Sequence, residues 1–87
     1  MNILFIADDM ATFKVYKDTT YVMMREAAKR GHQLFHCFSQ DLHIAGGVVQ
    51  TQARAFDFLG AKDDHDHAWF DLQAAQTVAL KDFSAVI

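Results

Sequence analysis

Two adjacent acidic residues, Asp8 and Asp9, follow an apolar run that begins at Ile3. A near-continuous apolar run predicts a strand that is covered on both faces, over residues 3–8. Carboxylates that follow the first strand of an α/β sheet lie at the edge where such sheets bind ligands. The pair could hold Mg²⁺ for phosphoryl chemistry, because carboxylate oxygens are ligands for this ion.

The magnesium hypothesis can be tested within the sequence. A receiver-type signalling module needs a third acid at the end of a later strand, and none of the runs near Ala53 ends in that way. In the simpler alternative, Asp8 accepts hydrogen bonds from backbone N–H groups of the following loop and Asp9 faces water. The residues alone leave both alternatives open.

A second candidate site is the stretch Lys17-Asp18-Thr19-Thr20. A cation and two hydroxyl groups at the start of a helix could bind an anionic ligand, because the helix dipole favours negative charge there. Alternatively, Asp18 or Thr19 simply caps the helix and Lys17 is solvated. The chain has no GxGxxG and no GxxxxGK[ST] motif, so the usual nucleotide fingerprints are missing.

Histidine and cysteine side chains are the remaining reactive groups. His65 and His67 could ligate a metal from one side of an extended segment, although polar loops of this composition are typically solvated. Cys37 lies within an apolar run, and its neighbour His36 points to the opposite face of a strand, so His36 cannot activate it. We expect Cys37 to be a buried apolar residue and the chain to hold no metal.

A strand–helix–strand unit is expected to position Asp8 and the Lys17 stretch. The helix opens within residues 17–20 and ends at Gly31, where a left-handed residue closes it. The second strand covers residues 33–38, and a helix between two such strands makes them parallel. The helix has an apolar stripe at helical spacing, formed by Tyr21, Met24, Ala27 and Ala28.

A β-hairpin is expected next, because two short runs flank Gly46-Gly47. Its second arm, residues 48–56, alternates polar and apolar side chains, so one face is expected to be wet. The remaining expected elements are a third short strand, a helical turn and a final strand, over residues 69–72, 80–83 and 85–87. The predicted class is α/β, with a parallel core and an antiparallel hairpin added to it.

Length and composition limit the function further. The 87 residues predict one small domain, and eight Phe and one Trp supply large buried areas. A net charge of −3 argues against a nucleic-acid or membrane surface, and no run is long enough to span a membrane. The single cysteine fits the reducing cytoplasm. Because the chain stops inside an apolar run, we expect it to be a piece of a longer protein.

The order of these features resembles the N-terminal domain of bacterial-type glutathione synthetases. The string KDTTYVMMREAAKRGHQL, residues 17–34, matches that family's K-D-[ST]-[ST] motif and its M-x-x-E-A-x-x-R-G-[HY] helix. Asp41-Leu42 precedes the Gly-Gly hairpin, as it does in the family. One departure is clear: the family usually has proline after the first-strand aspartate, where this chain has Asp9, so no ring fixes φ there.

The resemblance implies a small Rossmann-like, pre-ATP-grasp parallel sheet with a β-hairpin. Residues 1–87 would form a single substrate-side domain beside ATP-grasp domains that lie outside this chain. The family's reaction joins γ-glutamylcysteine to glycine through an acyl phosphate made from ATP, in a cytoplasmic homo-oligomer. The ATP-grasp domains would hold ATP and Mg²⁺ or Mn²⁺, so these 87 residues should carry no cofactor and be inactive alone.

The resemblance also suggests roles for particular residues on the dipeptide side. Asp8 would pin the loop after the first strand, Lys17 would attract the carboxylates of the dipeptide, and Asp18 and Thr19 would cap the helix. No catalytic residue and no metal ligand is expected. The alternative is a free-standing, receiver-like signalling module that binds Mg²⁺ through Asp8 and Asp9.

Overall fold

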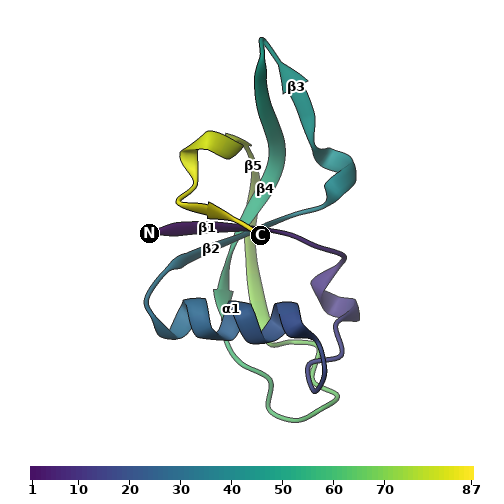
Figure 1. The fold of residues 1–87 in the computed structure, drawn as a ribbon. Helices are drawn as coiled ribbons and strands as arrows, with labels where there is room; N and C mark the ends of the chain where they lie inside the picture. Colours follow the sequence, from purple (N-terminus) through teal and green to yellow (C-terminus); the bar gives the residue numbers. More distant parts are fainter.

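The strand–helix–strand unit lies at the start of the chain in the computed structural model, which describes residues 1–87 (Figure 1). Strand β1 covers Asn2–Ile6, helix α1 covers Thr19–Lys29, and strand β2 covers Gln33–Cys37. β1 and β2 are parallel, with Leu4 opposite Phe35. The predicted parallel pairing is therefore confirmed.

β1 ends at Ile6, earlier than the strand predicted over residues 3–8. The Ala7 N–H still donates to the Cys37 carbonyl at 3.1 Å, but the chain then turns away from the sheet into a 3₁₀ turn at Met10–Thr12. Asp8 therefore lies just beyond the strand. This is the position that a ligand-binding residue at the carboxyl end of a strand requires.

The rest of the chain completes one six-stranded mixed sheet, in the order β3-β4-β2-β1-β6, with β5 paired to the other edge of β4. The added strands β3, β4, β5 and β6 cover His43–Ala45, Val48–Phe58, Phe70–Ala79 and Ala85–Val86. Two further 3₁₀ turns cover Ser39–Asp41 and Leu80–Asp82. β6 is parallel to β1, and the α/β class with parallel and antiparallel strands is confirmed.

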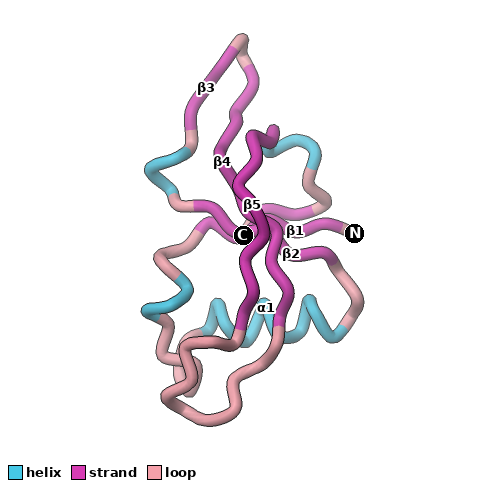
Figure 2. Tube along the Cα trace, turned by 180° about the vertical axis from the view of Figure 1, so that it is seen from behind, coloured by secondary structure: helices cyan, strands magenta, loops and turns pink.

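The β3–β4 hairpin forms where Gly46-Gly47 predicts it. Both glycines have positive φ, 58° and 78°, which a two-residue turn between twisted strands requires. Ile44 and Val49 face each other across the pair, and Figures 1 and 2 show the hairpin extending away from α1. β4 has the predicted solvent-exposed face: Gln52 and Arg54 are exposed, whereas Thr51 and Ala53 are buried.

β5 is much longer than the four-residue strand predicted over 69–72. It has ten residues and pairs antiparallel with β4, and the register shifts between Arg54 and Phe56, where Gln73 and Ala74 have no partner. Arg54 Nε donates to the carbonyl of Gln73 at 2.7 Å at this irregularity. The middle of β5 is exposed, so it carries no apolar alternation that could reveal a strand in the sequence.

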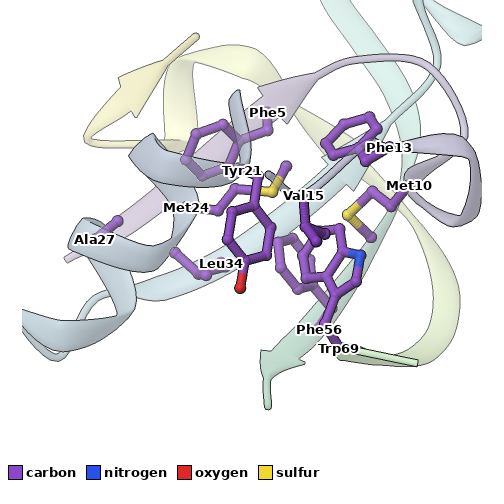
Figure 3. Close-up of a cluster of buried hydrophobic side chains, with 10 residues drawn as sticks. All are labelled: Phe5, Met10, Phe13, Val15, Tyr21, Met24, Ala27, Leu34, Phe56 and Trp69. Carbon is purple, nitrogen blue, oxygen red and sulfur yellow. The ribbon is translucent and has the colours of Figure 1, made fainter. Parts of the chain in front are cut away.

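The main hydrophobic core lies between α1 and the sheet (Figure 3). Trp69 is fully buried at its centre, stacked on Phe13 with a centroid distance of 5.8 Å and in edge contact with Tyr21 at 4.9 Å. Phe13 and Val15 anchor the loop between β1 and α1 to this core. The ten buried members are Phe5, Met10, Phe13, Val15, Tyr21, Met24, Ala27, Leu34, Phe56 and Trp69.

A smaller core covers the opposite face of the sheet. Its buried members are Leu4, Phe35, Cys37 and Ala53. Phe83, which follows the last 3₁₀ turn, packs edge-on against Phe35 with a centroid distance of 5.0 Å. β1 is thus buried on both faces, with Leu4 in one core and Phe5 in the other, which explains its near-continuous apolar sequence.

α1 carries the predicted apolar stripe, since Tyr21, Met24 and Ala27 are its buried residues. It ends as predicted: Gly31 has a φ of 80°, and its N–H donates to the Ala28 carbonyl at 3.0 Å. The structure contains no helix with the length and apolar character needed to cross a membrane.

Candidate functional site

A cleft of about 320 Å³ opens where the carboxyl end of β1 meets the N-terminal end of α1; we call it the β1 cleft. Asp8, just beyond β1, and Asp18, just before α1, line it together with Thr20 and Ser39. Ile6, Ala7 and Phe13 supply the rest of the wall. The start of α1 therefore lies on the side of the sheet edge where parallel strands carry their ligand-binding residues.

A second cleft, of about 480 Å³, lies against the loop that precedes α1; we call it the lysine cleft. Its lining residues are Thr12, Lys14, Lys17, Asp18 and Thr19. Asp18 lines both clefts, so they are adjacent. The structure thus gathers all four residues singled out in the sequence, with Asp8 in the β1 cleft, Lys17 and Thr19 in the lysine cleft, and Asp18 between them.

Asp18 is the N-cap of α1. Its carboxylate accepts a hydrogen bond from the Thr20 backbone N–H at 2.9 Å, and its carbonyl accepts from the Val22 N–H at 3.3 Å. Of the two capping residues that the sequence allows, Asp18 is therefore the N-cap and Thr19 is not. Thr19 is the first residue of the helix, is exposed, and its hydroxyl makes no hydrogen bond within the chain.

Lys17 is exposed and has no acidic partner, because the one ion pair of the chain joins Arg30 to Glu26. Lys14 lines the same cleft and is likewise exposed and unpaired, yet the sequence pattern did not single it out. Two ammonium groups beside the N-terminal end of a helix favour a ligand that carries negative charge.

The roles expected for the two first-strand carboxylates are exchanged. Asp9, which was expected to face water, accepts from the Ala11 N–H at 3.0 Å and caps the 3₁₀ turn, while its carbonyl accepts from the Thr12 hydroxyl. The Asp8 carboxylate accepts no hydrogen bond, so the prediction that Asp8 pins the loop is wrong. The φ of Asp9 is −54°, within the range that a proline ring would impose.

The receiver-like alternative is not supported. The strands on either side of β1 are β2 and β6, which end at Cys37 and Val86, so neither brings a third acid to Asp8 and Asp9. No group of three or more His, Cys, Asp or Glu side chains is arranged to hold a metal ion.

In the polar loop between β4 and β5, aspartate carboxylates accept hydrogen bonds from backbone N–H groups of the same loop. Asp66 accepts from the N–H groups of Lys62 and Ala68, at 2.9 and 2.8 Å, and these bonds lower the pKa of Asp66. Asp63 likewise accepts from the His65 N–H at 2.9 Å. The His65 and His67 region is therefore a self-capped loop, and none of its residues lines either cleft.

Cys37 is buried, as expected, and burial raises the pKa of its thiol above the ordinary value of 9.0, although a hydrogen bond with Thr51 offsets part of this effect. The protonated thiol therefore contributes stability below that pH, and the contribution decreases as the pH rises above it. We expect a disulfide reagent to label folded Cys37 at least about a hundredfold more slowly than the urea-unfolded chain, because labelling requires the fold to open. Equal rates in the folded and unfolded chain would contradict the burial.

Replacing the N-cap should destabilise the chain without disturbing its core. We expect Asp18→Ala to lower the free energy of unfolding by about 1 kcal/mol, because the Thr20 N–H loses its acceptor. Asp64→Ala is the matched control, since Asp64 is exposed and its carboxylate makes no hydrogen bond. Urea unfolding of both variants measures the difference, and equal stability of the two variants would exclude the capping role.

His36 is a residue of this region that the sequence pattern missed. It is 4% exposed, and its Nε2 lies 3.0 Å from the Ala7 carbonyl and 3.1 Å from the Asp8 carbonyl. A histidine in an apolar strand gives no sign of such a bond in the sequence. His36 and Cys37 are adjacent residues of β2, so their side chains point to opposite faces of the sheet.

Comparison with known proteins gives a match to one family over the whole chain. The family model described as the N-terminal domain of prokaryotic glutathione synthetase matches residues 1–87. The glutathione synthetase of Neisseria meningitidis serogroup B is 61% identical over 87 residues, and that of Ralstonia nicotianae is 42% identical over 87 residues. The glutathione synthetase of Vibrio cholerae serotype O1 is 28% identical over 82 residues.

These alignments cover nearly all of this chain and a minor part of each relative. They include 100% of the chain for the Neisseria and Ralstonia proteins and 94% for the Vibrio protein. The chain spans 27%, 26% and 24% of the length of these three relatives. With a family model matched from the first residue to the last, this chain belongs to the family of prokaryotic glutathione synthetase N-terminal domains.

Proposed function

We propose that this domain forms the dipeptide side of an ATP-dependent ligase that joins γ-glutamylcysteine to glycine and so forms glutathione. The observation that carries the proposal is the family match over residues 1–87, together with the meeting of the family motif residues at two adjacent clefts. The relatives named glutathione synthetase support the reaction.

The charges of the two clefts suit the dipeptide. γ-Glutamylcysteine carries two carboxylates and one ammonium group. Lys14 and Lys17 in the lysine cleft supply cations that can attract carboxylates, and the N-terminal end of α1 adds to this field. Asp8 in the β1 cleft offers a free carboxylate that can accept from an ammonium group.

ATP and its Mg²⁺ or Mn²⁺ are proposed to bind outside these 87 residues. The chain has no glycine-rich phosphate loop and no set of three grouped metal ligands, so its residues do not fit a nucleotide or its metal. The domain would therefore bind and orient the dipeptide while the reaction with ATP takes place on domains of the complete ligase that follow it.

The complete ligase is further proposed to be a cytoplasmic homo-oligomer. A requirement for ATP and a single buried thiol are consistent with the cytoplasm. The exposed pair Ile44 and Val49 on the projecting hairpin gives an apolar surface that a second subunit could cover. Light scattering of the complete protein tests this: a mass of one chain at all concentrations would contradict it.

Ligation assays test the proposed reaction. The complete protein should convert γ-glutamylcysteine and glycine to glutathione with stoichiometric release of phosphate from ATP, and the 87-residue chain alone should do neither. Catalysis of this type depends on metal-bound phosphates held by a dedicated site, which this chain lacks. Turnover by the isolated chain, or none by the complete protein, would contradict the proposal.

A further inference from the structure

His36 holds the peptide that carries Asp8. Its Nε2 lies within hydrogen-bond distance of two carbonyl oxygens, those of Ala7 at 3.0 Å and of Asp8 at 3.1 Å. Both oxygens can only accept, so Nε2 carries a hydrogen and shares it between them. His36 Nε2 is thus a side-chain donor directed at the chain where it leaves β1.

No other group replaces this donor. The β1–β2 ladder reaches its last bond when the Ala7 N–H donates to the Cys37 carbonyl, and the next capping contact begins at Asp9. Between them the Asp8 carboxylate is free, so the bond to its carbonyl is the contact that fixes this residue. Phe38 packs edge-on against the imidazole, at 4.9 Å and 87°, and holds the ring in place.

The two carbonyls belong to the wall of the β1 cleft, which includes Ile6, Ala7 and Asp8, whereas His36 does not line that cleft. His36 is 4% exposed and so cannot contact a ligand there directly. We propose that His36 is a positioning residue for the dipeptide side, which acts through the Ala7–Asp8 peptide to place the Asp8 carboxylate in the cleft. This inference rests on the function proposed above.

Kinetics of the complete ligase test the inference with three variants. His36→Phe keeps a ring but removes the donor, His36→Gln keeps an N–H donor, and His32→Phe makes the same change near the opposite end of β2. We expect His36→Phe to raise the KM for γ-glutamylcysteine about tenfold, because a small displacement of a substrate-positioning group is costly. The KM for ATP should stay within about twofold, and His36→Gln should recover most of the loss.

The outcomes separate a positioning role from a structural one. A selective rise in the KM for the dipeptide, with rescue by His36→Gln and no effect of His32→Phe, supports the inference. An unchanged KM for the dipeptide in His36→Phe overturns it. A parallel loss of kcat and of affinity for both substrates, with a lowered melting temperature, also overturns it. Absence of ligation by the wild-type protein would instead overturn the proposed function, and the inference with it.

Discussion

Trp69→Ala is expected to lower the free energy of unfolding by about 3–5 kcal/mol, because it removes the largest fully buried side chain and leaves a cavity. A domain of this size has about 5–15 kcal/mol of stability in total, so the variant should lose a large fraction of it and unfold at a lower urea concentration. The loss also frees Phe13, which stacks on the indole and anchors the loop before α1. Urea unfolding of the 87-residue chain, followed by far-ultraviolet circular dichroism, measures the change.

Two further substitutions make the Trp69 prediction specific. The indole Nε1 is buried and has no hydrogen-bond acceptor, so Trp69→Phe removes an unsatisfied donor along with some volume and should cost much less than Trp69→Ala. Leu59→Ala is the exposed control, since Leu59 is 63% exposed, and should change stability by less than about 0.5 kcal/mol. Similar losses for Trp69→Ala and Leu59→Ala would contradict the central place of Trp69 in the core.

Lys17→Ala in the complete ligase is expected to raise the KM for γ-glutamylcysteine about 10- to 100-fold, because a hydrogen bond to a charged group contributes about 1.5–3 kcal/mol. The side chain is exposed and has no ion-pair partner in the chain, so its loss should leave the fold unchanged. Steady-state kinetics with each substrate varied in turn measure the effect. The KM for ATP is expected to stay the same.

Lys29→Ala provides the matched control for Lys17. Lys29 is also exposed but lies in the last turn of α1, at the far end of the same helix. Lys29→Ala should therefore leave the KM for γ-glutamylcysteine unaltered. Unchanged kinetics in Lys17→Ala, or equal effects of the two substitutions, would remove Lys17 from the dipeptide side and leave the lysine cleft without a role.

Elements with an apolar run, a helical stripe or a turn signature were predictable from the sequence, whereas the full length of β5 was not. β1 and β2 carry apolar runs, α1 carries a stripe at helical spacing, and the hairpin has a Gly-Gly turn. β5 was predicted as a short strand because the exposed residues after Leu72 carry no alternation. Its pairing with β4 comes from backbone hydrogen bonds, which side-chain periodicity does not report.

The candidate site was also predictable only in part. The family motif places Asp18 as a cap and Lys17 beside it, and the structure has both at the clefts. The exchange of roles between Asp8 and Asp9 depends on the point where the chain turns from the sheet, which a pair of identical side chains cannot indicate. The bond from His36 joins residues far apart in the sequence, so only the fold reveals it.

The central claim, that these clefts form the dipeptide side of a ligase, is tested most directly by a crystal structure of the complete enzyme with γ-glutamylcysteine. We predict that a carboxylate of the dipeptide lies within hydrogen-bond distance of Lys17 Nζ, and that the dipeptide occupies the space between this lysine and Asp8. A dipeptide that is well ordered in the complete enzyme but contacts no residue of the β1 cleft or the lysine cleft would contradict the claim.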